Sequence, residues 1–269
     1  MRCLFCKRDS SGSRSVEHII PESLGNTKHV LPKGVVCDGC NNYFAKAVEK
    51  PFLESAGVKA LRFHESLKSK KGRVPPIDGI LAPGVKVRVT RHPRSDMTSI
   101  DVPEEAVRSL LQKSSGVLIL PTEGPMPTGP VVSRFLAKIA LESMAARLLG
   151  HPEGLAYLSD EPQLDAIRDH ARRGRTPAWP VHIRRIYPSE ASVPSEDGPQ
   201  QVVHESDFLV TDANEWYFVL AVFGTEFAIN IGGPHLDGYR RWLDENDGAS
   251  ILYSTKNLSL YPMPTIGSA

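Results

Sequence analysis

Two Cys-x-x-Cys stretches near the N-terminus decide the fold of the first part of the chain: Cys3-Leu4-Phe5-Cys6 and Cys37-Asp38-Gly39-Cys40. They hold all 4 cysteines of the 269-residue sequence. Paired stretches of this kind are typical of two zinc knuckles around one ion, and four thiolates leave that ion no open coordination position. We therefore predict a structural Zn²⁺ bound by Cys3, Cys6, Cys37 and Cys40.

The bulk composition is that of a globular protein, with 41% hydrophobic and 23% charged residues. No stretch approaches the roughly 20 apolar residues that a membrane span requires. The first residues lack the apolar region of a secretory signal. These features predict a cytoplasmic protein without a membrane partner, in which cysteines stay reduced and favour metal over disulfides. The net charge of +1 does not by itself indicate nucleic-acid binding.

Between and after the knuckles, the pattern predicts two strands and a helix. Residues 15–20 are expected to form a strand that ends at Pro21, and residues 30–36 a return strand. Apolar residues recur at helical spacing after Cys40, so a helix is expected to begin there and to end before Pro51. A module of this size has a small apolar core, and bound zinc would contribute to its folding free energy.

The remaining sequence predicts an α+β fold. Residues 85–90 alternate as a strand, residues 131–149 and 164–173 have helical periodicity, and residues 207–212, 216–222 and 226–232 predict strands with the second one central. Proline and glycine mark breaks near 74–84 and 121–130. We predict three segments: a metal-finger domain at 1–55, a linker with basic residues at 56–84, and a mixed α/β C-terminal domain at 85–269 that serves recognition, regulation or dimerisation.

Two basic runs in the sequence are candidates for phosphate-binding surfaces. Residues 59–73 carry six basic residues and one acid, and this run fits phosphate contact and a solvated helix end equally well. The second basic run predicts a solvated helix face and consists of Arg168, Arg172, Arg173 and Arg175.

The segment between the knuckles contains Glu17-His18-Ile19-Ile20-Pro21, and Asn41 directly follows the second knuckle. Together with the knuckles, these residues resemble the HNH endonuclease family, whose domain is a ββα-metal finger. The resemblance covers residues 3 to about 50. The form of the motif in this chain is similar to that of a bacterial subgroup with a long C-terminal extension. It implies that His18 is the general base, that Glu17 and Asn41 hold a catalytic Mg²⁺ or Mn²⁺, and that the four-cysteine zinc is structural.

The sequence departs from the family pattern at one place. The family usually has an asparagine about five residues before the second knuckle, which positions the catalytic histidine. Pro32 and Lys33 occupy that place here, and Asn26 lies further upstream. Along an ideal strand Glu17 and His18 face opposite sides, so their convergence requires a bulge at the strand end.

The resemblance implies an endonuclease that hydrolyses the phosphodiester bonds of DNA. The expected partner is double-stranded DNA, with little sequence preference from the finger, and a homodimer is expected for cutting two strands. A role in defence against foreign DNA is a further implication. Two alternatives stay open: a non-catalytic zinc module that binds nucleic acid or protein, and an RNase with the same site.

Overall fold

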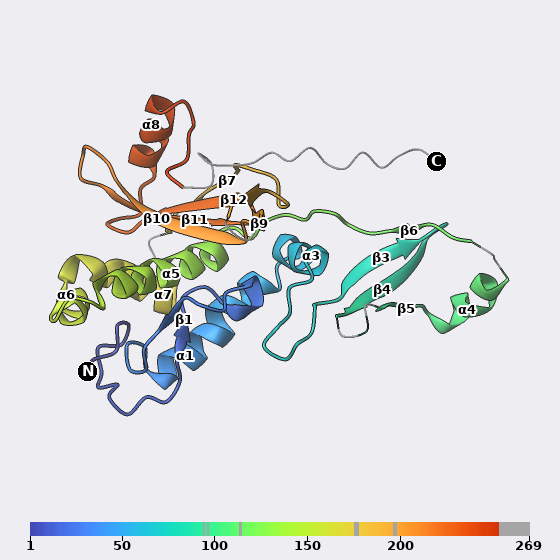
Figure 1. Cartoon of the computed structure of the whole chain (residues 1–269), viewed down its shortest axis with the longest axis horizontal. Helices are drawn as coiled ribbons and strands as arrows, with labels where there is room; N and C mark the ends of the chain where they lie inside the picture. Colours follow the sequence, from blue (N-terminus) through green and yellow to red (C-terminus); the bar gives the residue numbers. More distant parts are fainter. Residues whose placement is uncertain (94, 96, 113–114, 175–177, 196–197, 253–269) are drawn as a thin grey trace. The chain divides into compact units, whose positions relative to one another are not determined.

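The computed structural model describes residues 1–93, 95, 97–112, 115–174, 178–195 and 198–252. The chain combines helices with strands that form several separate sheets, so the fold is α+β, as predicted (Figure 1). By its contacts the chain divides into two compact units. The first unit contains Met1–Ile19, Val30–Phe44 and the residues from Thr128 onward, and the second contains Ile20–His29 and Ala45–Pro127.

The N-terminal part of the first unit has the predicted order of two strands and a helix. Strand β1 (Glu17–His18) pairs antiparallel with β2 (Val30–Leu31), and α1 (Asp38–Phe44) follows the second knuckle. Both strands are shorter than the periodicity suggested. Pro32 directly follows β2 and has no N–H to continue the ladder.

The helical backbone does not end before Pro51, which corrects the predicted boundary. A π-helical turn, η2 (Ala45–Glu49), follows α1 and leads into α2 (Lys50–Leu53). Pro51 cannot donate an α-helical hydrogen bond, and the π turn lies directly before the segment that contains it.

The main sheet of the first unit has the strand order β10-β11-β12-β7 and is antiparallel throughout. Strand β11 lies in its interior and coincides with the predicted central strand. Tyr217, Val219 and Ala221 of β11 pack into a core cluster with Tyr239 of α8. Phe218, Leu220 and Val222, which point to the other face of β11, are buried as well, so the strand is covered on both faces. The elements of this sheet are β7 (His182–Arg185), β10 (His204–Val210), β11 (Trp216–Val222), β12 (Thr225–Asn230) and α8 (Asp237–Glu245).

Helix α5 (Pro130–Leu148) confirms the long helix predicted at 131–149. It contacts strands β11 and β12, helices α6 and α7, and strand β2 of the N-terminal hairpin (Figure 1). It therefore connects the main sheet with the metal-finger segment. The other elements here are α6 (Gly154–Asp160), the 3-10 turn η3 (Pro162–Leu164), α7 (Asp165–Arg173) and a small ribbon of β8 (Ser192–Val193) and β9 (Gln200–Gln201).

The second unit is built on a sheet with the order β5-β4-β3-β6. The predicted alternating strand is β4 (Val85–His92), which buries Val87 and Val89 against Phe63 of α3. Helix α3 (Ala56–His64) and strand β3 (Ile77–Leu81) lie inside the segment expected to be a linker, so regular structure occupies much of it. The predicted boundaries at residues 55 and 84 stay a prediction, because a grouping by contacts does not say which segment folds by itself. The remaining elements are η1 (Glu22–Leu24), β5 (Met97–Asp101), α4 (Glu104–Leu111) and β6 (Leu118–Ile119).

Within the described part of the chain, no helix has both the length and the apolar character needed to cross a bilayer.

Candidate functional site

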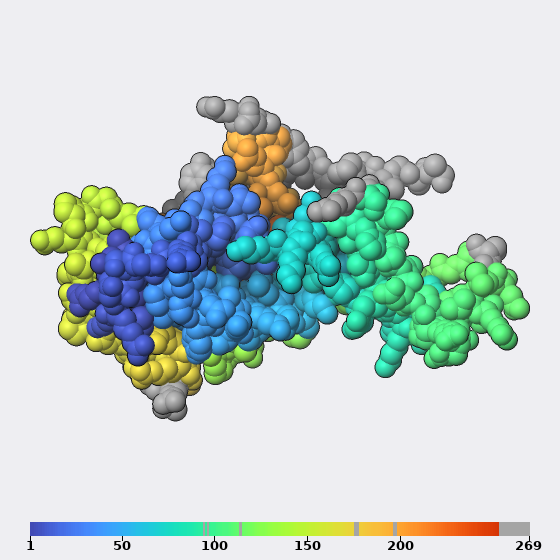
Figure 2. Space-filling model, turned by 90° about the horizontal axis from the view of Figure 1, so that it is seen from below, coloured from blue at the N-terminus to red at the C-terminus, as the bar shows by residue number. Residues whose placement is uncertain are grey.

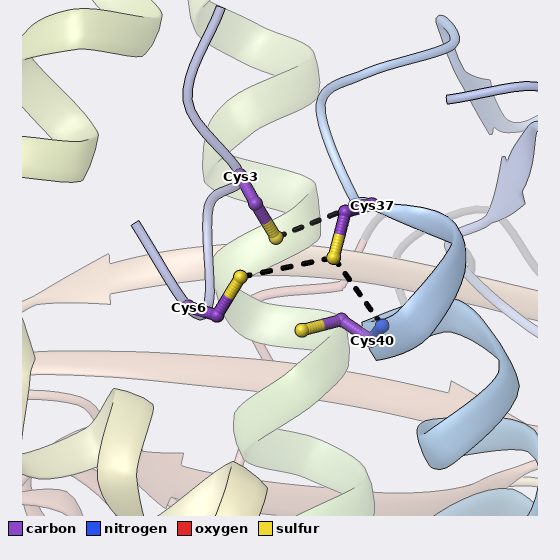
Figure 3. A group of neighbouring side chains, drawn as sticks. All are labelled: Cys3, Cys6, Cys37 and Cys40. Carbon is purple, nitrogen blue, oxygen red and sulfur yellow. Dashed lines mark hydrogen bonds between the residues drawn. The ribbon is translucent and has the colours of Figure 1, made fainter. Parts of the chain in front are cut away.

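The four cysteines predicted to bind zinc lie together at the start of α1, with their sulfur atoms pointing toward one another (Figure 3). All four sulfur atoms lie within 4.8 Å of one another, and the Cys6 and Cys37 sulfurs are 3.7 Å apart. Tetrahedral Zn–S bonds of about 2.3 Å place sulfur atoms about 3.8 Å apart. The cysteines are free thiols. The donor set therefore fits a zinc ion in both chemistry and size.

The proton affinities of the thiols show how closely the sulfurs are coupled. A hydrogen bond from Cys40 lowers the pKa of Cys3 to about 4, and the same bond raises the pKa of Cys40. Burial raises the pKa of Cys37, whose backbone N–H donates to the Cys3 sulfur at 3.3 Å. Four sulfurs this close cannot all carry negative charge without a cation between them. Zinc binding at this cluster therefore releases protons.

The first knuckle is held by helix α7. Arg168 is 3% exposed, and its Nε donates to the carbonyl of Leu4, which lies between Cys3 and Cys6, at 2.8 Å. Its Nη2 donates to the carbonyl of Leu158 at 2.8 Å. In Figure 2 the dark-blue N-terminal residues lie directly against the yellow residues of α7. The prediction of a solvated face is thus wrong for Arg168, and Arg175 lies outside the described residues.

The start of α1 also fixes the segment that leads into β1. The carboxylate of Asp38 accepts hydrogen bonds from the backbone N–H groups of Arg14 and Ser15 at 3.1 and 3.0 Å. One turn further on, Nδ2 of Asn41 donates to the carbonyl of Val16 at 3.0 Å. This bond leaves the amide oxygen of Asn41, the atom that a hard cation would bind, available for another partner.

Glu17 and His18 lie next to each other on β1 in regular register with β2. No bulge turns them to one side, so their side chains point to opposite faces of the strand. Glu17 is 5% exposed, and its Oε1 lies 2.7 Å from the Nζ of Lys138 on α5. The imidazole of His18 is half-buried, and its Nδ1 has no hydrogen-bond partner among the described residues. The assignment of Glu17 as a ligand of Mg²⁺ or Mn²⁺ stays a prediction. In the structure, the Glu17 carboxylate lies against the ammonium group of Lys138.

The connection between β1 and β2 depends on Asn26, which the sequence analysis did not include in the site. Asn26 is 1% exposed, and its Nδ2 donates to the carbonyls of Ile20 and His29 at 2.7 and 2.9 Å. Its Oδ1 accepts from the N–H groups of Lys28 and His29 at 3.1 and 2.8 Å. A single asparagine therefore closes the loop, although it lies upstream of the place where the family pattern has one. The signal in the sequence was the Gly25-Asn26 turn, and Gly25 has a left-handed φ of 88°.

Lys138 and Arg168 were also missed as residues that support the site. A sequence signal for Lys138 exists, because it interrupts an apolar helical run and has Glu142 four residues later. No local signal marks Arg168, since its partner Leu4 is 164 residues away.

A four-cysteine cluster that joins a β-hairpin to a helix, with a histidine on the first strand, defines a ββα-metal domain. Residues 3–56 match the family model of the HNH endonuclease, so the chain carries an HNH domain at its N-terminus and the resemblance is confirmed. Searches of curated proteins and of solved structures found no match. The HNH match supports a nuclease-type function and association with nucleic acid.

Proposed function

We propose that this protein is a metal-dependent endonuclease that hydrolyses the phosphodiester bonds of DNA, with His18 as its general base. The HNH match over residues 3–56, which includes His18 on the first strand of the motif, carries this proposal. A neutral imidazole takes a proton from water at physiological pH. His18 is half-buried and its Nδ1 is buried, so Nε2 is the ring nitrogen that would meet the water. His18 can therefore exchange a proton with a water molecule aimed at the scissile phosphorus.

The reaction also requires a divalent cation, Mg²⁺ or Mn²⁺. When bound, such an ion supplies positive charge for the transferred phosphoryl group and the leaving oxygen. The amide oxygen of Asn41 fits a hard cation, which takes few protein ligands and keeps several waters. The sequence predicts Glu17 as a second ligand, and its ion pair with Lys138 argues for a different role.

The zinc cluster supports this chemistry by fixing the backbone. The four cysteines join the first knuckle to the start of α1, and Asp38 and Asn41 of α1 hold the carbonyl and amide groups of residues 14–16. These contacts set the position of β1 and hence of His18. A four-thiolate zinc has no open position, so it has no direct role in hydrolysis.

We extend the proposal to double-stranded DNA as the substrate, to a homodimer that cuts both strands, and to defence against foreign DNA. A second candidate function is a non-catalytic zinc module that binds nucleic acid or protein. The pairing of Glu17 with Lys138 favours this second function, because that carboxylate is engaged by the chain itself.

Plasmid cleavage with Mg²⁺ or Mn²⁺ tests the proposal on wild type and His18→Ala. Loss of a general base lowers the rate by about 10²- to 10⁴-fold. His29→Ala, an exposed histidine in the same hairpin, is the matched control and should cut like wild type. Plasmid, single-stranded DNA and RNA digested side by side identify the substrate. Wild-type protein that leaves all three intact with both metals contradicts the enzyme proposal and supports the binding module.

A further inference from the structure

Helix α5 places a fully buried lysine directly beneath the proposed catalytic strand. The side chain of Lys138 has 0% exposure, and its Nζ lies 2.9 Å from Oε2 of Glu142, one turn along the same helix. The same Nζ lies 2.7 Å from Oε1 of Glu17 and 3.3 Å from the carbonyl oxygen of His18, which accepts a hydrogen bond from it. A lysine ammonium has three N–H donors, so one buried group can join its own helix to the strand beside it.

These contacts join α5 to β1. A hydrogen bond fixes the ammonium to its own helix through Glu142. An ion pair with the side chain of Glu17 and a hydrogen bond to the backbone of His18 reach β1. A group held on a rigid helix with two contacts to a short strand determines where that strand lies. Strand β1 has only two residues, so its own ladder with β2 restrains it little.

Stability alone gives no reason for a charge at this position. The neighbours of Lys138 on α5 are buried apolar residues, including Ala137, Ile139 and Leu141. Taking an ammonium and two carboxylates out of water costs more than their attraction returns in many proteins, and a well-packed apolar substitute often serves the fold as well. The cluster has a directional property that an apolar contact lacks, since it specifies which atoms of β1 meet α5.

We propose that Lys138 is a positioning residue of the nuclease site, which orients the imidazole of His18 by holding the Glu17 carboxylate and the His18 carbonyl. The inference rests on the proposed role of His18 as general base. In this assignment, Glu17 is the residue of β1 that pairs with Lys138, and its carboxylate points to α5. The last two-thirds of the chain thereby supplies a part of the site that the HNH segment lacks.

The test compares Lys138→Met with Ser133→Ala in the full chain with zinc bound. Ser133 is the matched control, because it is a buried polar residue of α5 whose hydroxyl contacts Gly129 and His170, away from β1. We expect Lys138→Met to lower kcat on plasmid about 10- to 100-fold, since a small misplacement of a reacting group has effects of this size. KM should stay within about two-fold, because DNA contacts are unchanged. Ser133→Ala should leave both constants near their wild-type values.

Two-dimensional NMR of ¹⁵N-histidine-labelled protein gives a readout that does not require activity. The His18 signals, assigned by their loss in His18→Ala, should shift or broaden in Lys138→Met and not in Ser133→Ala. If wild type fails to cut DNA, the proposed function fails, and this spectrum still tests the positioning role. His18 signals and kcat unchanged from wild type in Lys138→Met would overturn the inference.

Two further variants separate positioning from stability. Lys138→Arg keeps a buried cation with N–H donors and should recover part of the kcat lost in Lys138→Met. The triple variant Glu17→Gln, Lys138→Met, Glu142→Gln removes all three charges and should melt close to wild type, yet keep the low kcat and the altered His18 signals. A folded triple variant that cuts like wild type would show that Lys138 serves packing alone, and would overturn the inference even if Lys138→Met itself fails to fold.

Discussion

Replacement of Arg168 by methionine should destabilise the protein and loosen the zinc cluster together. Methionine keeps most of the apolar stem of arginine but removes both buried hydrogen bonds, to the carbonyls of Leu4 and Leu158. A buried acceptor left without its donor costs about 1–3 kcal/mol. Asp165, the third partner, is half-exposed and keeps Lys7 at 2.6 Å, so its loss of Arg168 adds little. The expected loss is therefore about 3 kcal/mol for the two carbonyls together.

The matched control is Arg173→Met, five residues after Arg168 on the same helix. Arg173 is 53% exposed, and among the described residues it has one ion pair, with Asp169 at 3.5 Å. Exposed pairs of this kind contribute about 0–1 kcal/mol. The two substitutions are chemically identical, so a difference between them isolates the effect of burial and of the contact with the knuckle.

Urea denaturation of the zinc-loaded proteins measures the difference. With a slope of about 3 kcal/mol/M, Arg168→Met should lower the midpoint by about 1 M, and Arg173→Met by a few tenths of that or less. Because Leu4 lies between two zinc ligands, transfer of zinc to a coloured chelator should also be faster in Arg168→Met. Equal midpoints and equal rates of zinc transfer for the two variants would refute the reasoning that α7 holds the first knuckle.

Four further predictions concern the site. Cys37→Ser should lose bound zinc and much of the fold of the HNH segment, as metal analysis and circular dichroism would show, since zinc binding contributes folding free energy; a folded variant without zinc contradicts this. Asn26→Ala should lower the free energy of unfolding by about 2–4 kcal/mol, because it removes four hydrogen bonds that are all buried or half-buried, and Thr27→Ala is the exposed control. A hydrogen bond from the Ser15 hydroxyl lowers the pKa of Asp38, so the stabilisation by this carboxylate is present at neutral pH and is lost as the pH falls through the lowered pKa. The unfolding midpoint of Asp38→Asn should therefore change less at acid pH than that of wild type. Parallel pH curves for the two proteins would contradict this prediction. Glu17→Gln should lower kcat without changing the Mn²⁺ concentration that gives half-maximal cleavage, whereas a large rise in that concentration would assign Glu17 to the metal.

Residues 3–19 and 30–44 of the HNH segment belong to the same compact unit as the helices after residue 128. Arg168 binds the first knuckle, and Lys138 binds the strand that carries His18. Both cations are buried, and both partners lie in the HNH segment. Separation of residues 3–56 from α5 and α7 would leave the Glu17 carboxylate and the Leu4 carbonyl without these partners. The C-terminal part of the chain therefore contributes to the geometry of the site as well as to any recognition or dimerisation that it performs.

Much of the fold follows from short-range patterns. The two Cys-x-x-Cys stretches predicted the sulfur cluster, and the apolar periodicity after residue 130 predicted α5 within one residue at each end. The central position of β11 followed from a long apolar run, which a strand buried on both faces requires. Errors lie at boundaries: β1 and β2 are two residues each, and a π turn takes the helix past Pro51. Periodicity reports which face is buried, and it does not report how far a ladder or helix continues.

The sequence by itself predicted the four-cysteine cluster, the family of the N-terminal segment and the place of His18 on its first strand, because each depends on residue types at fixed local spacing. Only the tertiary structure decided what Glu17 and His18 contact. The ammonium of Lys138 reaches the carbonyl of His18 across 120 positions of sequence, and the guanidinium of Arg168 reaches Leu4 across 164. A charged residue buried in an apolar helix requires a partner. Which residue becomes that partner depends on which segments pack together. Packing between segments that are distant in the sequence produces no local spacing from which the partner could be predicted.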